Sequence, residues 1–171
     1  MQEYKHLNVF DFDDTLFRVP NYTVSEAKGI EPYDWFDSPE SLDDRFGIRG
    51  ISNTINQVSD PSAVSIMVTH RVEDCADRVL ELLKERNLEF ESVYFLGRGS
   101  NKADTVMNFI EGTNIETITI FEDTLWEVLS YVKLFNAAKI SQEVDFVFVD
   151  KSKIIRIGWQ EALALAETVT Y

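Results

Sequence analysis

Acidic side chains cluster directly after a short apolar run near the beginning of the sequence. The run includes Val9 and Phe10, and Asp11, Asp13 and Asp14 follow at once. Burying several carboxylates in one place is costly unless a cation compensates their charge. Mg²⁺ suits this role because it takes one or two carboxylates together with water and phosphate oxygens. The cluster therefore predicts a magnesium site that also receives a phosphate.

The spacing of Asp11 and Asp13 suits phosphoryl transfer by a covalent route. If the strand geometry persists, side chains two residues apart leave the same face of the sheet. Asp11 would attack phosphorus to form an aspartyl-phosphate. Asp13 would protonate the leaving oxygen and later deprotonate the attacking water. The pair thus predicts a phosphohydrolase with Asp11 as nucleophile and Asp13 as general acid and base.

Other polar residues follow the later strand-like runs of the sequence. They are Thr69, His70, Arg71, Lys102, Glu122 and Asp123. Each has an ordinary structural interpretation by itself, as a helix cap, a surface charge or an acid at a helix start. Because ligands bind beyond the carboxyl ends of parallel strands, the recurrence at successive strand ends favours one shared site.

These residues suggest separate roles at such a site. Lys102 would neutralise charge on the phosphoryl group and restrain the nucleophile, and the Thr69 hydroxyl would donate to a phosphoryl oxygen. Asp123 would close the metal site together with Glu122. Glu127 lies four residues after Asp123 on the same face of an expected helix, so it could join directly or through water.

Three further residues are candidates for substrate binding. Thr15 follows the first acids, and Arg71 suits phosphate, although a salt bridge with Glu73, Asp74 or the first acids is equally expected. Trp35 belongs to a group of aromatic residues that would either stack on a nucleobase or cover the core. The other members of this group are Tyr22, Tyr33, Phe36 and Phe46. The single cysteine, Cys75, is expected to pack inertly in a helix.

Strand-like and helix-like segments alternate along the chain, which predicts an α/β protein with a three-layer Rossmann-like fold and a mainly parallel central sheet. The expected strands are 7–12, 64–69, 92–96 and 117–121. The expected helices are 72–86, 102–111 and 124–135. The first helix would bury Ala76, Val79, Leu80 and Leu83, and the third would bury Leu125, Val128, Leu129 and Val132.

Two regions depart from this alternation. Residues 18–61 contain all four prolines and predict a small insertion or lid, with Ser38 capping a short helix that has Pro39 in its first turn. Segments 146–149 and 154–157 predict a strand hairpin at the sheet edge, followed by a helix over 159–167.

Length, composition and net charge limit the classes of protein to which this chain can belong. A chain of 171 residues that is 44% apolar predicts a single domain over 1–171. The sequence shows neither a secretory signal nor an apolar stretch that crosses a bilayer, so we expect a soluble, cytoplasmic protein with no membrane partner. The net charge of −14 repels polyanions and weakens a nucleic-acid hypothesis without excluding it. The oligomeric state stays open.

Together these residues resemble the motifs of the haloacid dehalogenase-like (HAD) superfamily of phosphohydrolases. The segment 9–17 looks like the first motif, an apolar strand followed by Asp-x-Asp-x-Thr, and 66–69 resembles the second. Lys102 resembles the third motif and 121–123 the fourth. The resemblance implies that Asp11 is the nucleophile, that Asp13 also offers its backbone carbonyl to Mg²⁺, and that Asp123 is a further metal ligand.

Within that superfamily, segments 15–20 and 35–42 are similar to the Swiss Army Knife RNA repair-like group. That group tends to show Glu-Asp-Arg followed by His after the fourth strand, whereas Thr124 and Glu127 occupy these places here. This departure bears on the substrate more than on the phosphatase chemistry.

Four functions therefore stand as alternatives at the level of sequence. The first is a phosphatase of nucleotides or nucleic-acid phosphate ends, and the second is a phosphatase of small phosphorylated metabolites. The third is a non-catalytic relative that binds a phosphorylated partner. A dehalogenase is disfavoured because that chemistry does not explain the acids after the fourth strand.

Overall fold

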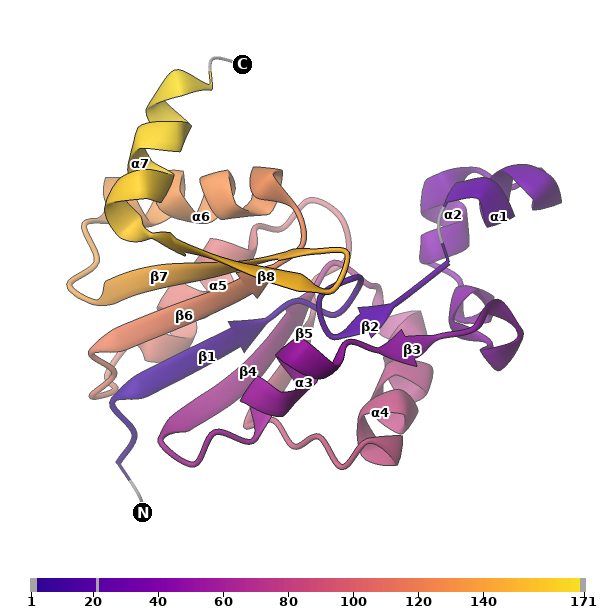
Figure 1. Cartoon of the computed structure of the whole chain (residues 1–171), viewed down its shortest axis with the longest axis horizontal. Helices are drawn as coiled ribbons and strands as arrows, with labels where there is room; N and C mark the ends of the chain where they lie inside the picture. Colours follow the sequence, from indigo (N-terminus) through magenta and orange to yellow (C-terminus); the bar gives the residue numbers. More distant parts are fainter. Residues whose placement is uncertain (1–2, 21, 170–171) are drawn as a thin grey trace.

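Six strands form one sheet at the centre of the molecule (Figure 1). The computed structural model describes residues 3–20 and 22–169. The strands lie in the order β5-β4-β1-β6-β7-β8, and every neighbouring pair is parallel except the antiparallel pair β7–β8. Their bounds are β1 His6–Phe10, β4 Ala63–Thr69, β5 Ser92–Phe95, β6 Thr117–Glu122, β7 Glu143–Asp150 and β8 Lys153–Gly158. The expected mainly parallel sheet with a terminal strand hairpin is confirmed.

Residues of opposite parity in each strand supply two separate apolar cores, because successive side chains of a strand point to opposite faces. On one face, Leu7 and Val9 of β1 join Ile120 of β6. On the other, Phe10 of β1 stacks on Phe121 of β6 with ring centroids 4.3 Å apart. Both faces of the sheet are therefore buried, as expected of a parallel sheet.

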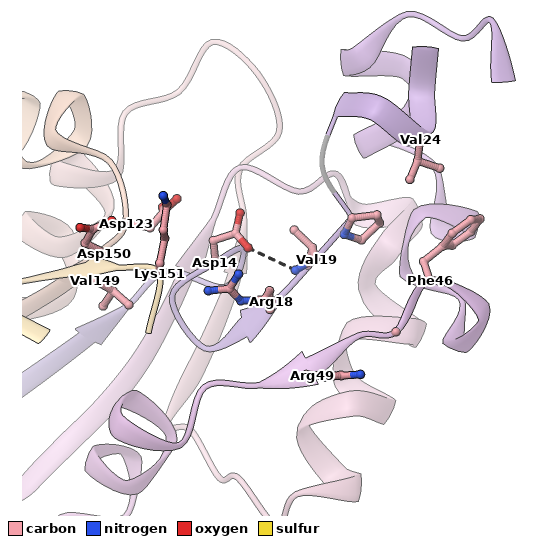
Figure 2. A pocket seen from close by; sticks show the side chains of 12 residues that line it. Asp14, Arg18, Val19, Val24, Phe46, Arg49, Asp123, Val149, Asp150 and Lys151 are labelled. Carbon is pink, nitrogen blue, oxygen red and sulfur yellow. Dashed lines mark hydrogen bonds between the residues drawn. The ribbon is translucent and has the colours of Figure 1, made fainter. Parts of the chain in front are cut away.

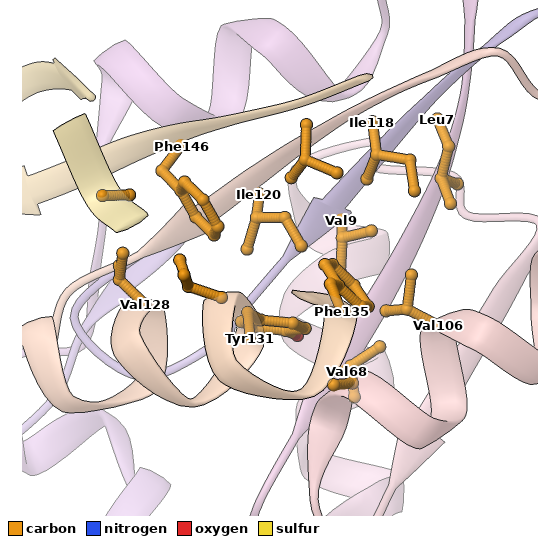
Figure 3. Close-up of a cluster of buried hydrophobic side chains, with 14 of the residues drawn as sticks. Leu7, Val9, Val68, Val106, Ile118, Ile120, Val128, Tyr131, Phe135 and Phe146 are labelled. Atoms are coloured by element: carbon orange, nitrogen blue, oxygen red, sulfur yellow. The ribbon is translucent and has the colours of Figure 1, made fainter. Parts of the chain in front are cut away.

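Helices cover both faces and give the fold its three layers. The first core lies against α5 Lys102–Ile110, α6 Leu125–Ala138 and α7 Trp159–Thr168, and Figure 3 shows side chains of α6 packed against the strands. The second core lies against α4 Ala76–Glu85 and α3 Ser52–Val58. The expected Rossmann-like fold is confirmed.

The insertion after β1 is more structured than a simple lid. A ribbon of β2 Phe17–Arg18 and β3 Arg49–Gly50 leads to a helical lobe that projects beyond the carboxyl end of the sheet (Figure 1). The lobe contains α1 Tyr22–Lys28, α2 Pro32–Phe36, η1 Pro39–Leu42 and η2 Asp44–Phe46. Ser38 caps η1 as expected, since its side chain accepts a hydrogen bond from the Glu40 amide at 3.3 Å.

The helix after β4 buries Val79 and Leu83 as expected, but the expected burial of Leu80 was wrong. The chain is still extended at Val72, forms the short helix η3 Glu73–Cys75, and only then enters α4. The buried stripe of α4 consequently includes Val79, Leu82 and Leu83, whereas Leu80 is 46% exposed. Leu125 was also expected to be buried and is 41% exposed; it is the first residue of α6, just beyond the carboxyl end of β6.

Within the described part of the chain, the structure contains no helix whose length and apolar character would let it cross a membrane.

The two leucines of α4 provide a matched test of its orientation. Replacing Leu83 by Ala should lower the free energy of unfolding by about 2–5 kcal/mol, because it opens a cavity in a closed core. Replacing Leu80 by Ala should cost less than about 1 kcal/mol, since the side chain is already half in water. Urea unfolding of both variants measures the difference. Equal losses would contradict the observed orientation of α4.

Candidate active site

The residues expected to do chemistry converge at the carboxyl end of the sheet. The chain passes from β1 to β4 on one side, whereas β6 flanks β1 on the other, so β1 marks the switch point where such sheets bind ligands. A cavity of about 550 Å³ opens there. Its lining includes Asp11, Asp13, Asp14, Tyr33, Phe36, His70, Arg71, Arg98, Lys102, Glu122, Asp123 and Glu127.

Lys102 binds two carboxylates at the floor of this cavity. Its Nζ donates to Asp11 Oδ1 at 2.9 Å and to Glu122 Oε1 at 2.6 Å. Asp11 lies two residues after Val9, and Glu122 lies two residues after Ile120. Side chains two residues apart in a strand point to the same face, so both acids point to the face that α5 covers. Lys102 begins α5 and therefore meets both. All three side chains are almost completely buried.

A third carboxylate completes a candidate metal site. Asp11, Glu122 and Asp123 each offer an oxygen, and these oxygens lie within 4.8 Å of one another. Glu122 Oε2 is buried and has no hydrogen-bond partner within the described residues. An all-oxygen donor set with an unsatisfied buried oxygen fits a hard divalent cation such as Mg²⁺. These residues therefore fit the expected magnesium site.

Burial and mutual repulsion shape the protonation of these acids. Burial raises the pKa of Asp11, although Lys102 opposes the increase. Burial likewise raises the pKa of Glu122 well above its usual value. Burial, together with the charges of Asp11 and Asp14, raises the pKa of Asp123 to about 8. Burial by itself would lower the pKa of Lys102, but Asp11 and Glu122 hold it well above its ordinary value. The site thus holds more acidic groups than one lysine can keep ionised.

Asp13 points to a different partner from Asp11. The Nε of Arg71 donates to both Asp13 oxygens at 3.0 and 3.1 Å, and its Nη2 donates to Oδ1 at 2.6 Å. The Nη1 of Arg71 donates to Ser41 Oγ at 2.5 Å and to the Phe36 carbonyl. The alternative in which Arg71 pairs with the first acids is therefore the one observed. The guanidinium is buried and bound to the protein, so contact of Arg71 with substrate stays a prediction.

The two threonines lie beneath the cavity and do not line it. Thr15 is fully buried and donates to Asp11 Oδ2 at 3.3 Å, so it orients the carboxylate instead of contacting a substrate. Thr69 is also fully buried, and its hydroxyl oxygen accepts from the Arg71 amide at 3.1 Å. Thr15 therefore supports Asp11, whereas Thr69 supports the backbone that carries Arg71.

Glu127 lies outside the three-carboxylate cluster and pairs with His70. The His70 Nε2 to Glu127 Oε1 distance is 3.0 Å, and His70 Nδ1 lies 3.0 Å from the Gly97 carbonyl oxygen. The hydrogen bond to Glu127 raises the pKa of His70, and burial partly opposes it. Glu127 is therefore not a direct member of the metal cluster, contrary to one expectation. The sequence did not predict the pairing of His70 with Glu127, because 57 residues separate the two.

The expectation that Trp35 binds substrate is corrected. Trp35 is fully buried, and its ring packs edge-on against Phe46 at 5.2 Å between centroids. Trp35 therefore fills the core of the insertion. Tyr33 instead lines the active-site cavity with 66% of its surface exposed, and Arg98 lies over its ring at 4.8 Å. The Tyr22 side chain lies outside the described part of the structure.

Comparisons with known proteins identify the fold. No protein-family profile matches the sequence, and no curated protein is similar to it in sequence. The HAD domain of the effector protein Lem4 from Legionella pneumophila is 14% identical, with a TM-score of 0.55 over 95% of this chain and 94% of that chain. The class C acid phosphatase from Bacillus anthracis is 15% identical, with a TM-score of 0.56 over 99% of this chain and 76% of that chain.

A third solved structure is the Pnkp1/Rnl/Hen1 complex. One of its chains is 10% identical, with a TM-score of 0.51 over 86% of this chain. The present chain spans 46% of the length of that chain. These likenesses establish that the protein has the HAD-like fold, which confirms the resemblance seen in the sequence at the level of the fold.

The raised pKa of Asp123 predicts how stability depends on pH. Its pKa of about 8 exceeds the ordinary 3.8, so between these values the folded state binds more protons than the unfolded state. The free energy of unfolding should therefore fall as pH rises from 5 to 8 in the presence of a chelator. Urea unfolding across this range measures the fall.

Asp123→Asn should reduce this fall, because an amide does not ionise. Asp145→Asn, which changes an exposed acid on β7, is the matched control and should keep the wild-type dependence. A pH dependence that is identical in Asp123→Asn and wild type would contradict the assignment.

Proposed function

We propose that the protein is a magnesium-dependent phosphatase that acts through an aspartyl-phosphate on Asp11. The observation that carries this proposal is the environment of Asp11. Its carboxylate is buried at the floor of a cavity, bonded to Lys102 and Thr15, and it lies beside two further acids that fit a metal. A non-catalytic phosphate-binding protein would not need an anionic carboxylate at the place where the phosphate should bind.

Lys102 and Thr15 prepare Asp11 for attack on phosphorus. Burial raises the pKa of Asp11, and Lys102 opposes this increase and so favours the ionised carboxylate. Lys102 and Thr15 each donate to a different oxygen of Asp11. An ionised carboxylate has about four acceptor positions, so lone pairs remain on Asp11 for the attack on phosphorus. Two contacts from different directions fix the orientation of the carboxylate, which favours a near-attack geometry. In this proposal Asp11 forms the new bond to phosphorus.

Asp13 is the proposed general acid and base. Its side chain is 28% exposed and lines the cavity, so a leaving oxygen or an attacking water can reach it. Arg71 restrains the carboxylate from the opposite side and ties it to the insertion. Asp13 would give a proton to the leaving oxygen and then take one from the water that hydrolyses the aspartyl-phosphate. Arg71 acts here as a positioning residue.

Asp11, Glu122 and Asp123 would hold Mg²⁺, and the backbone carbonyl of Asp13 is a further proposed ligand. When bound, the ion supplies positive charge that offsets the acids and the phosphoryl oxygens. Lys102 supplies the remaining positive charge at the floor of the site. Glu127 and His70 form part of the wall.

Replacement of Asp11 by Asn tests the proposed mechanism. With Mg²⁺ and p-nitrophenyl phosphate, Asp11→Asn should lower kcat by at least about 10³-fold, because an amide is not a nucleophile. Acid quenching of the wild type should trap a phosphoenzyme that hydroxylamine cleaves, and the variant should give none. Asp74→Asn, at an exposed site on η3, is the control and should keep normal activity. A near-normal rate in Asp11→Asn would overturn the covalent route.

The proposed substrate is a nucleotide or a phosphate end of nucleic acid. The sequence resemblance to the RNA repair-like group supports this class, and Tyr33 offers an exposed ring at the cavity for a base to stack on. A net charge of −14 opposes general attraction of a polyanion, so only the terminal one or two nucleotides should bind. A phosphatase of sugar phosphates is the second candidate, and a screen of both substrate classes decides between them.

Tyr33→Ala tests stacking directly. The ratio of kcat/KM for a nucleotide to kcat/KM for p-nitrophenyl phosphate should fall about 5- to 100-fold, which corresponds to the loss of one base stack. Trp126→Ala is the matched control, because this aromatic residue is 61% exposed and does not line the cavity. An unchanged ratio in Tyr33→Ala would remove the physical support for nucleotide recognition.

A further inference from the structure

A second cavity adjoins the active-site cavity. It has a volume of about 640 Å³ and shares Asp14, Val19 and Asp123 with the first (Figure 2). Away from this shared wall, it is lined by Arg18 and Arg49 of the β2–β3 ribbon and by Lys151 of the β7–β8 turn. The two cavities therefore have a common wall, and three basic side chains line the second one.

These three basic residues are exposed, and the same cavity is also lined by Asp14, Asp123 and Asp150. Within the described residues, none of Arg18, Arg49 and Lys151 forms a salt bridge. Arg18 and Arg49 are also direct partners across the ribbon, and like charges at such positions repel. The protein has only 16 basic residues against 30 acidic ones. Three cations without a close ion pair along one cavity of an acidic protein favour an anion as its ligand.

The turn that carries Lys151 is held in a costly conformation. Lys151 and Ser152 have φ angles of 48° and 81°, a region that residues other than glycine and asparagine seldom adopt. Two contacts with the insertion hold this turn. Arg18 Nη2 donates to Ser152 Oγ at 3.3 Å, and Asn53 Nδ2 donates to the Ser152 carbonyl at 2.9 Å. These bonds fix the turn beside the strand that carries Arg18.

The acids of this cavity are distributed unevenly. Asp14 and Asp123 belong to the wall shared with the active site, and Figure 2 shows Asp14 between the turn with Lys151 and the strand with Arg18. Asp150 lies next to Lys151 in the sequence. Burial raises the pKa of Asp14, and its Oδ1 accepts from the Val19 amide at 3.2 Å. The cavity therefore changes from acidic beside the proposed metal site to basic at the ribbon.

We propose that Arg18, Arg49 and Lys151 bind a second phosphate carried by the leaving group of the substrate. The preferred substrates are then phosphomonoesters whose leaving alcohol bears another phosphate. This inference rests on the proposed phosphatase function. The second phosphate has two sources with the same chemistry, the internucleotide phosphate of an oligonucleotide with a terminal phosphate and the second phosphate of a small bisphosphate. The insertion thereby acts as a specificity element.

Paired substrates test this inference. The ratio of kcat/KM for a nucleoside 3′,5′-bisphosphate to kcat/KM for the corresponding 3′-monophosphate should exceed one in the wild type. Arg49→Gln and Arg18→Gln should each lower this ratio about tenfold, because each removes a charge-assisted hydrogen bond to phosphate. Arg156→Gln removes the same charge from an exposed position on β8 outside both cavities, so it should leave the ratio unchanged.

Two further substrate pairs distinguish the sources of the second phosphate. A dinucleotide with a 3′-terminal phosphate is compared with the nucleoside 3′-monophosphate, and fructose 1,6-bisphosphate is compared with fructose 1-phosphate. Preference for the dinucleotide assigns the cavity to an oligonucleotide end, and preference for the sugar bisphosphate assigns it to a metabolite. Equal rates within every pair would overturn the inference.

Binding to the inactive Asp11→Asn protein separates this inference from the proposed function. Calorimetry should show that adding Arg49→Gln weakens the affinity for the nucleoside bisphosphate about tenfold, whereas adding Arg156→Gln should not. If this difference appears but the wild type hydrolyses no phosphomonoester, the second cavity stands and the proposed function fails. If hydrolysis proceeds but neither arginine changes the ratio or the affinity, the second cavity is not a phosphate site.

Discussion

The ion cluster of Lys102 with Asp11 and Glu122 is the interaction on which the rest of the site depends. Moving a lysine and two carboxylates out of water is costly, and their attraction compensates only when the geometry is good. The sheet provides that geometry, because Asp11 and Glu122 leave neighbouring parallel strands on the face that α5 covers. The cluster still has an unsatisfied oxygen on Glu122, and burial raises the pKa of that carboxyl well above its usual value. A divalent cation beside Asp123 would relieve both.

The insertion is coupled to this chemistry through Arg71. The same guanidinium holds Asp13 and two groups of the insertion, the Phe36 carbonyl and the Ser41 hydroxyl. Movement of the insertion is therefore linked to the orientation of the proposed general acid and base. Two aromatic residues of the insertion have different roles. Trp35 is buried and stabilises the lobe, whereas Tyr33 is exposed and faces the cavity. The lobe thus belongs to the site and is more than a cover for it.

Charge is organised locally in this acidic protein. The whole surface repels anions at a net charge of −14, yet Lys102 lies at the floor of one cavity and Arg18, Arg49 and Lys151 line the next. Such a distribution disfavours long polyanions and favours a compact ligand with a few phosphate groups. The strand ends and the insertion both line the first cavity, and the insertion supplies most of the lining of the second.

The sequence by itself determined the alternation of strands and helices, the hairpin at the sheet edge and the cluster of Asp11, Lys102 and Asp123, because these follow from local periodicity and from polar residues at strand ends. It did not predict the short helix η3 after Val72, or that Leu82 instead of Leu80 joins the buried face of α4. Only the tertiary structure decided that Arg71 binds Asp13, that Trp35 is buried, and that Arg18 and Lys151 line one cavity. These outcomes depend on how segments far apart in the chain pack, and no local pattern records that packing.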